Sequence, residues 1–382
     1  MRREPWRLAW GSAEVPHAVI DILRGCNISC KACYNSAPPA FKTLRQIEQE
    51  LERLLELRRL HSIVLLGGEV TLHPQLCEII HLIREKGVHV ELFTNAVLLN
   101  DEFAARLKAA GTDLVFVHIE PGQVRPDLPP GSSGSRLRGL LEEKASILAR
   151  HGITAGYSFT AYPEDWEALL QGIQYAVESP VIEYLLITLY RDMRRMGGIH
   201  GSLAEELRGE PGRPSADPQK DITLGQVQHV LSERLGLLPF AYVPSNRDAS
   251  ERRWLSYLLG CIVREGKPTV CRPILASAFE RIFTKVHRLL TGRASFYQRN
   301  RPLRIRLHLL LNAVSGGAFL TNMRLLSRGT LGFGRLKCLR LVFQSPAELD
   351  GEGRVIHCLD CPDAALRKGR LVPVCLMDQI VS

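Results

Sequence analysis

The sequence predicts an α/β fold built on a parallel sheet, and three observations lead to it. Over the first half of the 382 residues, short runs rich in β-branched residues alternate with stretches of helical periodicity. Turn residues bound the expected strands, and cap residues and glycines bound the expected helices. Six units of about 25–35 residues imply parallel strands joined by right-handed crossovers. This pattern is compatible with a closed barrel, a partial barrel and an open doubly wound sheet.

The expected elements follow one another along the chain. Strands are expected at residues 19–23, 62–66, 88–93, 114–119, 153–160 and 182–189, and helices at 43–60, 74–86, 100–110, 136–151 and 164–178. After Tyr190 the alternation stops, and residues 192–220 are rich in Gly, Pro and charge, as linkers are. A helix is expected at 223–236, and two stretches, 303–311 and 318–326, have helical spacing. The expected domains are a core (1–191), a linker with a helix (192–246), a basic, mostly helical segment (247–335) and a small C-terminal module (336–382).

The composition is that of a globular protein with one unusual segment. Hydrophobic residues make up 45% and charged residues 23%, which excludes a wholly disordered chain. There is no run of 18 apolar residues and no apolar signal core, which favours a cytoplasmic protein. The net charge is +9, yet residues 247–340 hold 19 Lys+Arg and only 4 Asp+Glu. Such a segment favours phosphate, nucleic acid or an anionic membrane as partner, and the alternative is a solvated, arginine-rich helical face.

Three cysteines directly after the first expected strand carry the strongest chemical signal. Cys26, Cys30 and Cys33 have the spacing C-x3-C-x2-C. Three thiolates on one short loop can hold a [4Fe–4S] cluster and leave one iron open, because four would be needed to bind every iron. A fourth cysteine elsewhere could close the site. Zinc is the other alternative, although structural zinc loops usually pair two C-x2-C knuckles.

This cysteine spacing, in a series of βα units, resembles the radical S-adenosylmethionine (SAM) superfamily. Gly67-Gly68-Glu69, at the end of the second strand, resembles the GGE motif of that family. The resemblance covers residues 15–190 and implies a partial (β/α)6 barrel, followed here by a basic helical segment and a small C-terminal iron–sulfur module. In parallel barrels the chemistry gathers at the carboxyl ends of the strands, where both motifs lie.

The resemblance also implies roles for residues that would bind SAM. Glu69 would pair with the methionyl ammonium group, and Gly67 and Gly68 would let the backbone pass close to the ligand. Thr94 and Asn95, at the end of the third strand, could hydrogen-bond the ribose or the carboxylate. Ordinary capping of a strand end is the alternative for both.

Other strand-end residues are candidates with less support. Ser158, on the fifth strand, could contact SAM as Thr94 does. His118 and Glu120 face the expected substrate site and are expected to hydrogen-bond or pack there. The family usually has an aromatic residue before the third cysteine, but this chain has Ala32 there, and Tyr34 follows the cluster instead.

A second group of cysteines lies near the C-terminus. Cys358 and Cys361 form C-x2-C, Cys375 follows after 13 residues, and Cys338 precedes them. The three-cysteine spacing resembles the C-terminal cluster of the molybdenum-cofactor cyclases, and the stretch from Cys338 resembles SPASM and twitch modules. The resemblance implies a second, auxiliary [4Fe–4S] cluster, with Cys338 as a fourth ligand. Tetrahedral zinc on the same thiolates is the alternative.

The remaining cysteines carry weaker signals. Cys77 lies in the apolar stripe of the second helix and is expected in the core. Cys261 and Cys271 flank a loop of the basic segment, as buried thiols or as ligands of a further site.

The resemblance implies a radical SAM enzyme. Its reduced cluster would cleave SAM to methionine and a 5′-deoxyadenosyl radical, which abstracts hydrogen from an unactivated carbon. Flavodoxin or ferredoxin would supply the electron, and no nucleic acid is expected as a partner. A non-enzymatic iron–sulfur redox protein is the alternative, and Gly67-Gly68-Glu69 argues against it.

The expected substrate rests on a further resemblance. Two stretches are similar to segments of a group that contains archaeal tetraether-lipid synthases and related methylases: His118-Ile-Glu-Pro-Gly-Gln123 with Arg125-Pro126, and Cys361-Pro-Asp-Ala with Leu371-Val-Pro-Val-Cys375. Lipid is therefore the first expectation, and a ribosomally made peptide, as for SPASM maturases, is the second. A helix within 281–306, with arginines around apolar residues, would suit docking on an anionic membrane. The expected location is cytoplasmic, peripheral at the membrane.

Overall fold

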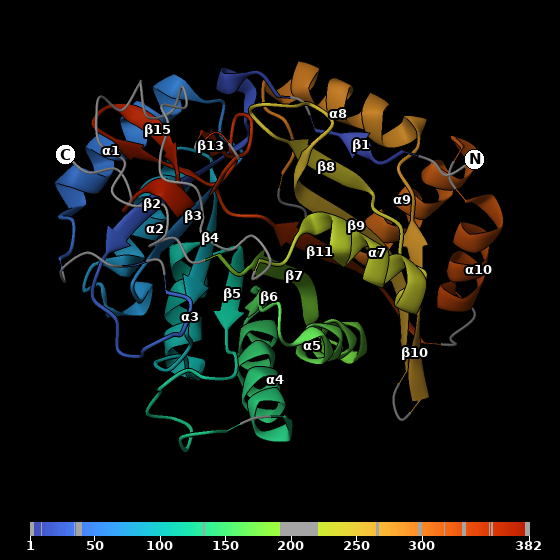
Figure 1. The fold of residues 1–382 in the computed structure, drawn as a ribbon, viewed down its shortest axis with the longest axis horizontal. Coiled ribbons are helices and arrows are strands. Elements are labelled where there is room, and N and C mark those ends of the chain that lie inside the picture. The colour runs from blue at the N-terminus through green and yellow to red at the C-terminus, as the bar shows by residue number, and fades with distance from the viewer. Residues whose placement is uncertain are drawn as a thin grey trace.

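The computed structural model describes residues 4–8, 10–33, 35, 40–132, 134–191, 221–264, 267–296, 300–316, 318–330, 334–350, 352 and 354–378. One large sheet of 13 strands runs through them, with helices on both sides (Figure 1). The expected linker at 192–220 lies outside the described residues.

Six parallel strands form the centre of the sheet in chain order. They are β2 (His17–Leu23), β3 (Ser62–Gly67), β4 (His89–Thr94), β5 (Leu114–His118), β6 (Thr154–Ala161) and β7 (Ile182–Leu189). The connecting helices are α1 (Leu44–Leu57), α2 (Leu76–Glu85), α3 (Asp101–Ala110), α4 (Ser135–Arg150) and α5 (Trp166–Glu178). The expected βα series is confirmed, and with it the largely parallel sheet of a partial (β/α)6 barrel.

These elements form for local reasons that the sequence contains. All seven residues of β2 are buried, because helices cover one face of the strand and the barrel interior covers the other. Helix α1 begins with a capping box in which Thr43 and Gln46 bond reciprocally. Helix α3 begins at the cap Asn100 and ends at Gly111, whose φ of 105° a glycine adopts without strain.

The sheet continues past β7 with strands from the second half of the chain. Strand β11 (Arg335–Gln344) pairs in parallel with β7, and β9 (Arg252–Arg264) pairs antiparallel with β11. Beyond them lie β8 (Ala241–Pro244) and β1 (Trp6–Arg7), while β10 (Lys267–Ile274) forms a hairpin with β9. The expectation of a mostly helical segment at 247–335 is therefore wrong for its first part. Strand β9 is buried on both faces, so it lacks the alternation that marks a half-exposed strand.

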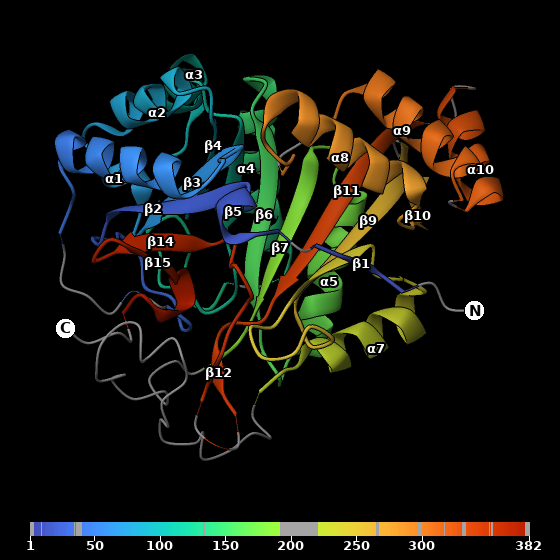
Figure 2. The same cartoon turned by 90° about the horizontal axis from the view of Figure 1, so that it is seen from above.

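Four described helices come from the second half of the chain. They are α7 (Leu224–Leu235), α8 (Ala278–Thr291), α9 (Pro302–Val314) and α10 (Phe319–Thr330). A second core, which includes Leu258, Ile262, Leu309 and Leu325, joins α9 and α10 to β9. Figure 2 shows α8, α9 and α10 together on one side of the molecule, away from strand β12 (Glu348–Leu349).

The C-terminal segment runs from one edge of the central strands to the other. After β11, strands β12 and β13 (Val355–Ile356) form a hairpin, and so do β14 (Ala364–Arg367) and β15 (Arg370–Pro373). Strand β14 then pairs with β2 through Ala365 and Val19. The C-terminal residues are thus part of the same sheet, joining its β7 side to its β2 side.

Cys261 and Cys271 face each other across the β9–β10 hairpin and form a disulfide. Neither is free to serve as a ligand of a further site. Of the helices among the described residues, none combines the length and the apolar character needed to cross a bilayer.

Candidate active site

The carboxyl ends of the central strands bring the candidate residues together. The loop that follows β2, residues 24–43, carries Cys26, Cys30 and Cys33 and is called the cluster loop below. Around it, Glu69 follows β3, Thr94 ends β4 and is followed by Asn95, His118 ends β5, and Ser158 lies in β6. Tyr34 lies outside the described residues.

The three thiols of the cluster loop lie close enough to influence one another. Cys26 and Cys33 are exposed, and Cys30 is half-buried. Burial raises the pKa of Cys26, and the charges of Glu69, Cys30 and Cys33 raise it further. Burial likewise raises the pKa of Cys33, with Cys30 adding to the shift. Thiolates that repel one another in this way are stabilised when they share cationic iron, so this donor set fits an iron–sulfur cluster.

Gly67 and Gly68 bring β3 against the backbone that enters the cluster loop. A Cβ on Gly67, whose φ is 155°, would lie 1.9 Å from the carbonyl oxygen of Leu23. A Cβ on Gly68 would lie 2.1 Å from that of Gly25. The Gly68 amide donates to Leu23 O at 2.6 Å, and the Glu69 amide donates to Gly25 O at 2.9 Å. The close approach made by the two glycines is thus to the start of the cluster loop, which they hold in position.

Glu69 is buried and joins two strand ends. Its Oε1 accepts hydrogen bonds from the Thr71 amide and hydroxyl and from the Thr94 hydroxyl, the last at 2.6 Å. Its Oε2 accepts from the Asn95 amide at 2.7 Å. A carboxylate oxygen can accept more than one hydrogen bond, so Oε2 keeps capacity for a further donor such as an ammonium group.

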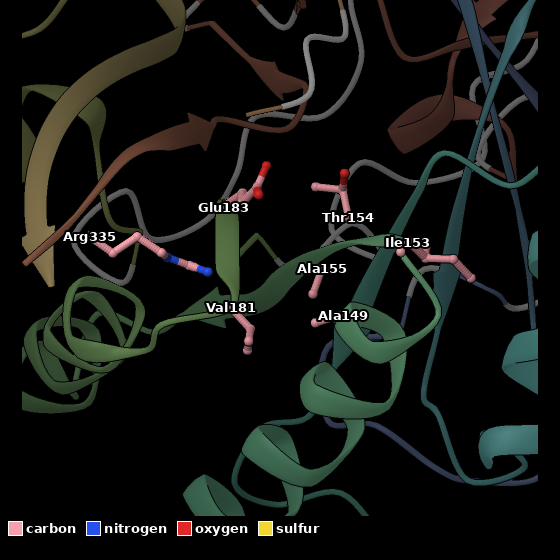
Figure 3. Close-up of a pocket in the computed structure, with 8 residues that line it drawn as sticks. Ala149, Ile153, Thr154, Ala155, Val181, Glu183 and Arg335 are labelled. Atoms are coloured by element: carbon pink, nitrogen blue, oxygen red, sulfur yellow. The ribbon is translucent and has the colours of Figure 1, made fainter. Parts of the chain in front are cut away.

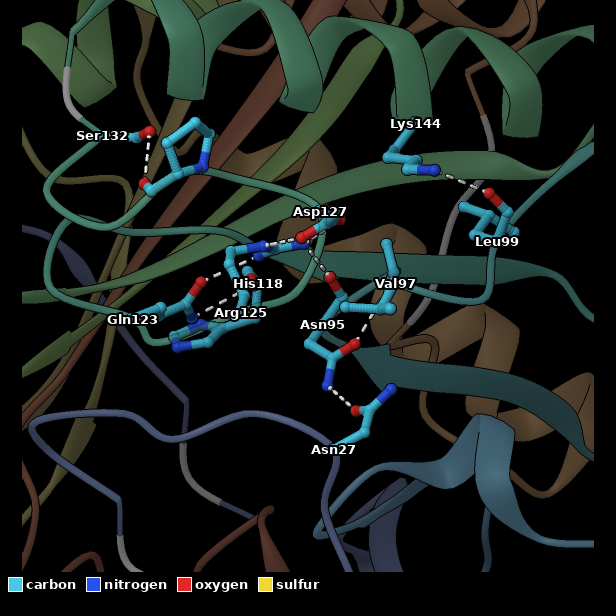
Figure 4. A network of polar contacts seen from close by, with 12 residues as sticks. Asn27, Asn95, Val97, Leu99, His118, Gln123, Arg125, Asp127, Ser132 and Lys144 are labelled. Atoms are coloured by element: carbon cyan, nitrogen blue, oxygen red, sulfur yellow. Dashed lines mark hydrogen bonds and ion pairs between the residues drawn. The ribbon is translucent and has the colours of Figure 1, made fainter.

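Asn95 connects the end of β4 to the cluster loop. Its Nδ2 donates to Asn27 Oδ1 at 2.7 Å and lies 3.8 Å from Cys26 Sγ. Its Oδ1 accepts from the Val97 amide at 3.0 Å (Figure 4). The side chain is therefore fixed at both ends, beside one thiol.

Arg125, in the loop after β5, is at the centre of a polar network (Figure 4), and Gln123 extends this network to a second thiol. Arg125 is buried, forms an ion pair with Asp127, and donates to Asn95 O at 2.9 Å. It also donates to Gln123 Oε1 at 2.9 Å, and Gln123 Nε2 lies 3.5 Å from Cys30 Sγ. The network thus links the ends of β4 and β5 to the cluster loop.

His118 lies between an acid and a thiol. Its Nε2 is 3.7 Å from Glu120 Oε1, and its Nδ1 is 3.2 Å from Ser158 Oγ. Burial alone would lower the pKa of His118, but Glu120 and Cys30 together raise it to about 10. Glu120 Oε2 is held by the Thr160 amide at 2.7 Å. Glu120 and Cys30 thus favour the charged form of the imidazole.

Sequence reasoning missed the clamp that the loop after β5 forms on the cluster loop. Ser29 and Val124 exchange backbone hydrogen bonds of 3.1 and 2.9 Å, and Gln123 and Arg125 lie on either side of Val124. The sequence contained one signal for these residues: Gln123 and Arg125 follow a strand whose carboxyl end faces the site.

The C-terminal thiols form a second group, in which Cys358 and Cys361 are buried and Cys375 is half-buried. Cys358 and Cys361 are 4% and 7% exposed, and a hydrogen bond between them lowers the pKa of Cys358 and raises that of Cys361. Burial, with the charge of Cys358, raises the pKa of Cys375 to about 12. Arg58 donates to Cys361 O at 2.9 Å. Three neighbouring thiols that influence one another's pKa are a donor set suited to a second cluster.

Cys338 is not part of this group, which corrects the expectation of a fourth ligand. It lies in β11 opposite Gly260 of β9 and packs with Leu258 and Ile305 in the second core. Burial raises its pKa to about 11, and no thiol charge contributes. It is six residues, or roughly 20 Å of strand, from Gln344, which contacts the segment after Cys361. Its side chain is a small core residue.

The zinc alternative does not fit the described residues. Among them, no three His, Cys, Asp or Glu side chains converge on the position of a single metal ion. Structural zinc needs four ligands around one point. A [4Fe–4S] cube instead takes each thiolate on a different iron, so its ligands are spread around a larger body.

The pocket drawn in Figure 3 belongs to the other end of the strands. It measures about 150 Å³ and is lined by residues such as Ile153, Thr154 and Val181, at the amino ends of β6 and β7. The thiols lie beyond the carboxyl ends, so this pocket is separate from the candidate site.

We expect Gly68→Ala to unfold the start of the cluster loop. The new Cβ would meet backbone at Gly25, which has no rotamer through which to yield, so a loss of about 1–3 kcal/mol in the free energy of unfolding is expected, together with loss of bound iron. Thermal unfolding and iron content measure both. Gly139→Ala in α4 is the matched control, because nothing lies within 4 Å of its Cβ and alanine favours a helix. Equal iron content in both variants would contradict the positioning role of Gly68.

Part of the expected core, residues 1–191, is similar to known radical SAM proteins. Residues 20–125 match the model of the radical SAM superfamily. The chain is 30% identical over 159 residues to an Fe-coproporphyrin III synthase of Methanosarcina barkeri, covering 40% of this chain and 39% of that protein. It is 28% identical over 167 residues to the antilisterial bacteriocin subtilosin biosynthesis protein AlbA of Bacillus subtilis, covering 41% and 36%.

Among solved structures, the crystal structure of Streptococcus suis SuiB is similar with a TM-score of 0.40 and 15% identity, over 58% of this chain and 47% of that one. The matches span well under half the length of the two curated relatives named above. The segment that matches the superfamily contains all three cysteines of the cluster loop and the Gly67-Gly68-Glu69 motif. The part of the chain that carries both motifs is thus similar to the radical SAM superfamily, in agreement with the resemblance found in the sequence.

Proposed function

We propose that the chain holds a [4Fe–4S] cluster on Cys26, Cys30 and Cys33, binds SAM at the open iron, and modifies a peptide. The observation that carries the first part is the clamped cluster loop, held by β3 on one side and by Gln123 and Val124 on the other. Cys26, Cys30 and Cys33 would hold the cluster, which would supply the electron for reductive cleavage of SAM and so initiate abstraction of hydrogen from the substrate.

The side chains at the strand ends would orient SAM. Glu69 has acceptor capacity left on Oε2 for the ammonium group, and its other bonds fix the carboxylate in place. Asn95 stands beside Cys26, where the polar end of SAM would meet the open iron. Ser158 is engaged with His118, so we assign it to orienting that imidazole.

We propose that Cys358, Cys361 and Cys375 hold the auxiliary cluster. Three thiolates leave one iron of a cube open, as at the first site. Cys358 and Cys361 are buried among Val243, Trp254 and other apolar side chains, which would limit the access of water to the cluster. Relatives named as the subtilosin biosynthesis protein AlbA and the mycofactocin maturase MftC support a maturase of this general kind.

The comparisons favour peptide or haem chemistry over the lipid that we expected first. A cavity of about 320 Å³ lies at the carboxyl end of β7, beside Arg253, whose charge lowers the pKa of Cys358. It is called the polar cavity below, after its charged and polar lining residues: Arg191, Thr223, Gln228, Ser250, Glu251, Arg252, Arg253, Ser345 and Glu348. Several of these groups bond to one another, since Glu348 pairs with Arg191 and Arg253, and Arg252 donates to Gln228.

An iron porphyrin is the second candidate substrate. Its support is the similarity to an Fe-coproporphyrin III synthase and to an AdoMet-dependent heme synthase, both of Methanosarcina barkeri. Porphyrin carboxylates could use the same arginines of the polar cavity.

The test uses anaerobically reconstituted full-length protein with SAM and dithionite, or with reduced flavodoxin or ferredoxin as the proposed physiological donor. Release of 5′-deoxyadenosine is expected, and its absence would favour the non-enzymatic iron–sulfur protein. Candidate peptides encoded near the protein, iron coproporphyrin and phospholipid are then added separately. Stimulation by porphyrin or lipid alone, with no change in any peptide mass, would overturn the peptide assignment.

A further inference from the structure

The outward faces of α8, α9 and α10 are strongly apolar. They carry twelve large exposed side chains, called the helical patch below: Ile282, Phe283, Val286, Leu289, Leu290, Leu303, Leu307, Leu310, Val314, Phe319, Leu320 and Met323. Leu289 and Leu290 are 85% and 78% exposed. Single exposed leucines are ordinary, but a group of this size on adjoining helices marks an interaction surface.

Helix α9 shows that the outward apolar face is separate from the core face. Ile305 and Leu309 point into the second core. Leu303, Leu307, Leu310 and Val314 form another stripe at spacings of four, three and four, and all are exposed. A helix that packs only on its own protein has one such stripe, with polar residues opposite. The second stripe therefore faces something outside this part of the chain.

The charges around the helical patch are nearly all positive. Residues 278–330 contain ten Lys+Arg and a single acid, Glu280. Glu280 is buried and bonded to Ser277 and Asn312, so it does not offset the surface charge. Seven of the basic residues are exposed on the three helices: Arg281, Lys285, Arg288, Arg304, Arg306, Arg324 and Arg328.

We propose that the helical patch docks this protein on an anionic membrane surface, with α8, α9 and α10 lying in the headgroup region. Apolar side chains enter the acyl boundary while the surrounding arginines and lysines meet lipid phosphates, which is how interfacial helices bind. A second copy of the chain would set one such group of cations against another. Nucleic acid would satisfy the cations but offers nothing to twelve large apolar side chains.

The orientation of such docking follows from where α8 lies. Arg288 forms an ion pair of 2.7 Å with Glu14, which precedes β2. Arg293 donates to Gly87 O at 2.9 Å, just before β4, and the rings of His287 and His61 are 6.1 Å apart. These partners all precede strands, so α8 lies at the amino end of the barrel.

The candidate active site therefore faces away from the membrane in this arrangement. The cluster loop follows the carboxyl ends, and a strand of six or seven residues separates the two ends by about 20 Å. Docking in this orientation would not place a membrane lipid directly at the barrel mouth. The helical patch would instead hold the enzyme at a membrane while the site takes substrate from the aqueous side.

Vesicle binding by the full-length protein tests this proposal. In co-sedimentation with 100 nm vesicles, we expect binding to phosphatidylcholine containing 30% phosphatidylglycerol, little binding to phosphatidylcholine alone, and loss of binding as salt rises. The double variant Leu289→Glu, Leu290→Glu should weaken binding by about a hundredfold or more. Arg281→Gln, Lys285→Gln and Arg304→Gln together should weaken it by about a hundredfold, at about fivefold per cation.

The control is Leu235→Glu, an exposed leucine of α7 outside the helical patch, which should bind vesicles like the wild type. Iron content and 5′-deoxyadenosine release should be unchanged in every variant, so failure here is distinguishable from failure of the proposed function. Equal recovery with neutral and anionic vesicles, or none with either, would overturn the proposal. So would salt-sensitive binding to nucleic acid without binding to vesicles.

Discussion

Alanine at Cys26, Cys30 or Cys33 is expected to abolish SAM cleavage, whichever of the three is replaced. Two thiolates cannot hold a cube while leaving one iron open for SAM. The measurement is release of 5′-deoxyadenosine under reducing conditions, with iron per chain determined on the same samples.

Cys77→Ala is the matched control for these three variants. Cys77 is a free cysteine of α2 that is half-buried, and it belongs to neither thiol group. Its loss should leave iron content and 5′-deoxyadenosine release at the level of the wild type. Full activity in any one of the three cluster-loop variants would show that the assignment of the catalytic cluster is wrong.

The first half of the fold could be predicted because its signals are local. Each strand from β2 to β7 is a short β-branched run with turn residues at its ends. The helices between them have apolar stripes, and α1, α3 and α5 begin at side-chain caps. The superfamily motifs then decided between a barrel and an open sheet. The match of residues 20–125 agrees with that choice.

The second half could not be predicted in the same way because its pairing is non-local. Strand β11 inserts between β7 and β9, which come from about 150 and 80 residues earlier in the chain. Buried on both faces, β9 has no period-2 alternation to distinguish it from a buried helix. This pairing is also what carries Cys338 away from Cys358, since it fixes Cys338 opposite Gly260. Spacing along the sequence contained no sign of that separation.

The site was predictable where the motif supplied the residues and not where tertiary contacts did. Glu69 and Asn95 lie at the carboxyl ends of β3 and β4, where the sequence predicted them. Gln123 and Arg125 contact the cluster loop only because the loop after β5 folds back onto Ser29. The conformation of the loop after β5 depends on the segment that it contacts, so residue type and periodicity do not predict it.

Cys358→Ala is expected to remove about half of the bound iron while SAM still binds. The wild type should hold about eight irons per chain after anaerobic reconstitution, four for each cube, and this variant about four. The same result is expected for Cys361→Ala and Cys375→Ala, because the three thiols influence one another's pKa and form one group. Iron and zinc analysis, with equilibrium binding of SAM, measures the outcome.

The variant Cys338→Ala tests whether Cys338 is a fourth ligand of the second group, as the sequence predicted, or a core residue, as the structure indicates. If Cys338 were the fourth ligand, its loss would cost iron as that of Cys358 does. In the structure, however, Cys338 lies in β11 among core side chains of α9 and β9. The variant is therefore expected to keep about eight irons per chain and to lose little stability. Loss of about four irons in this variant would place Cys338 in the cluster after all. Zinc in place of iron, with only about four irons in the wild type, would show that the C-terminal thiols hold no auxiliary cluster.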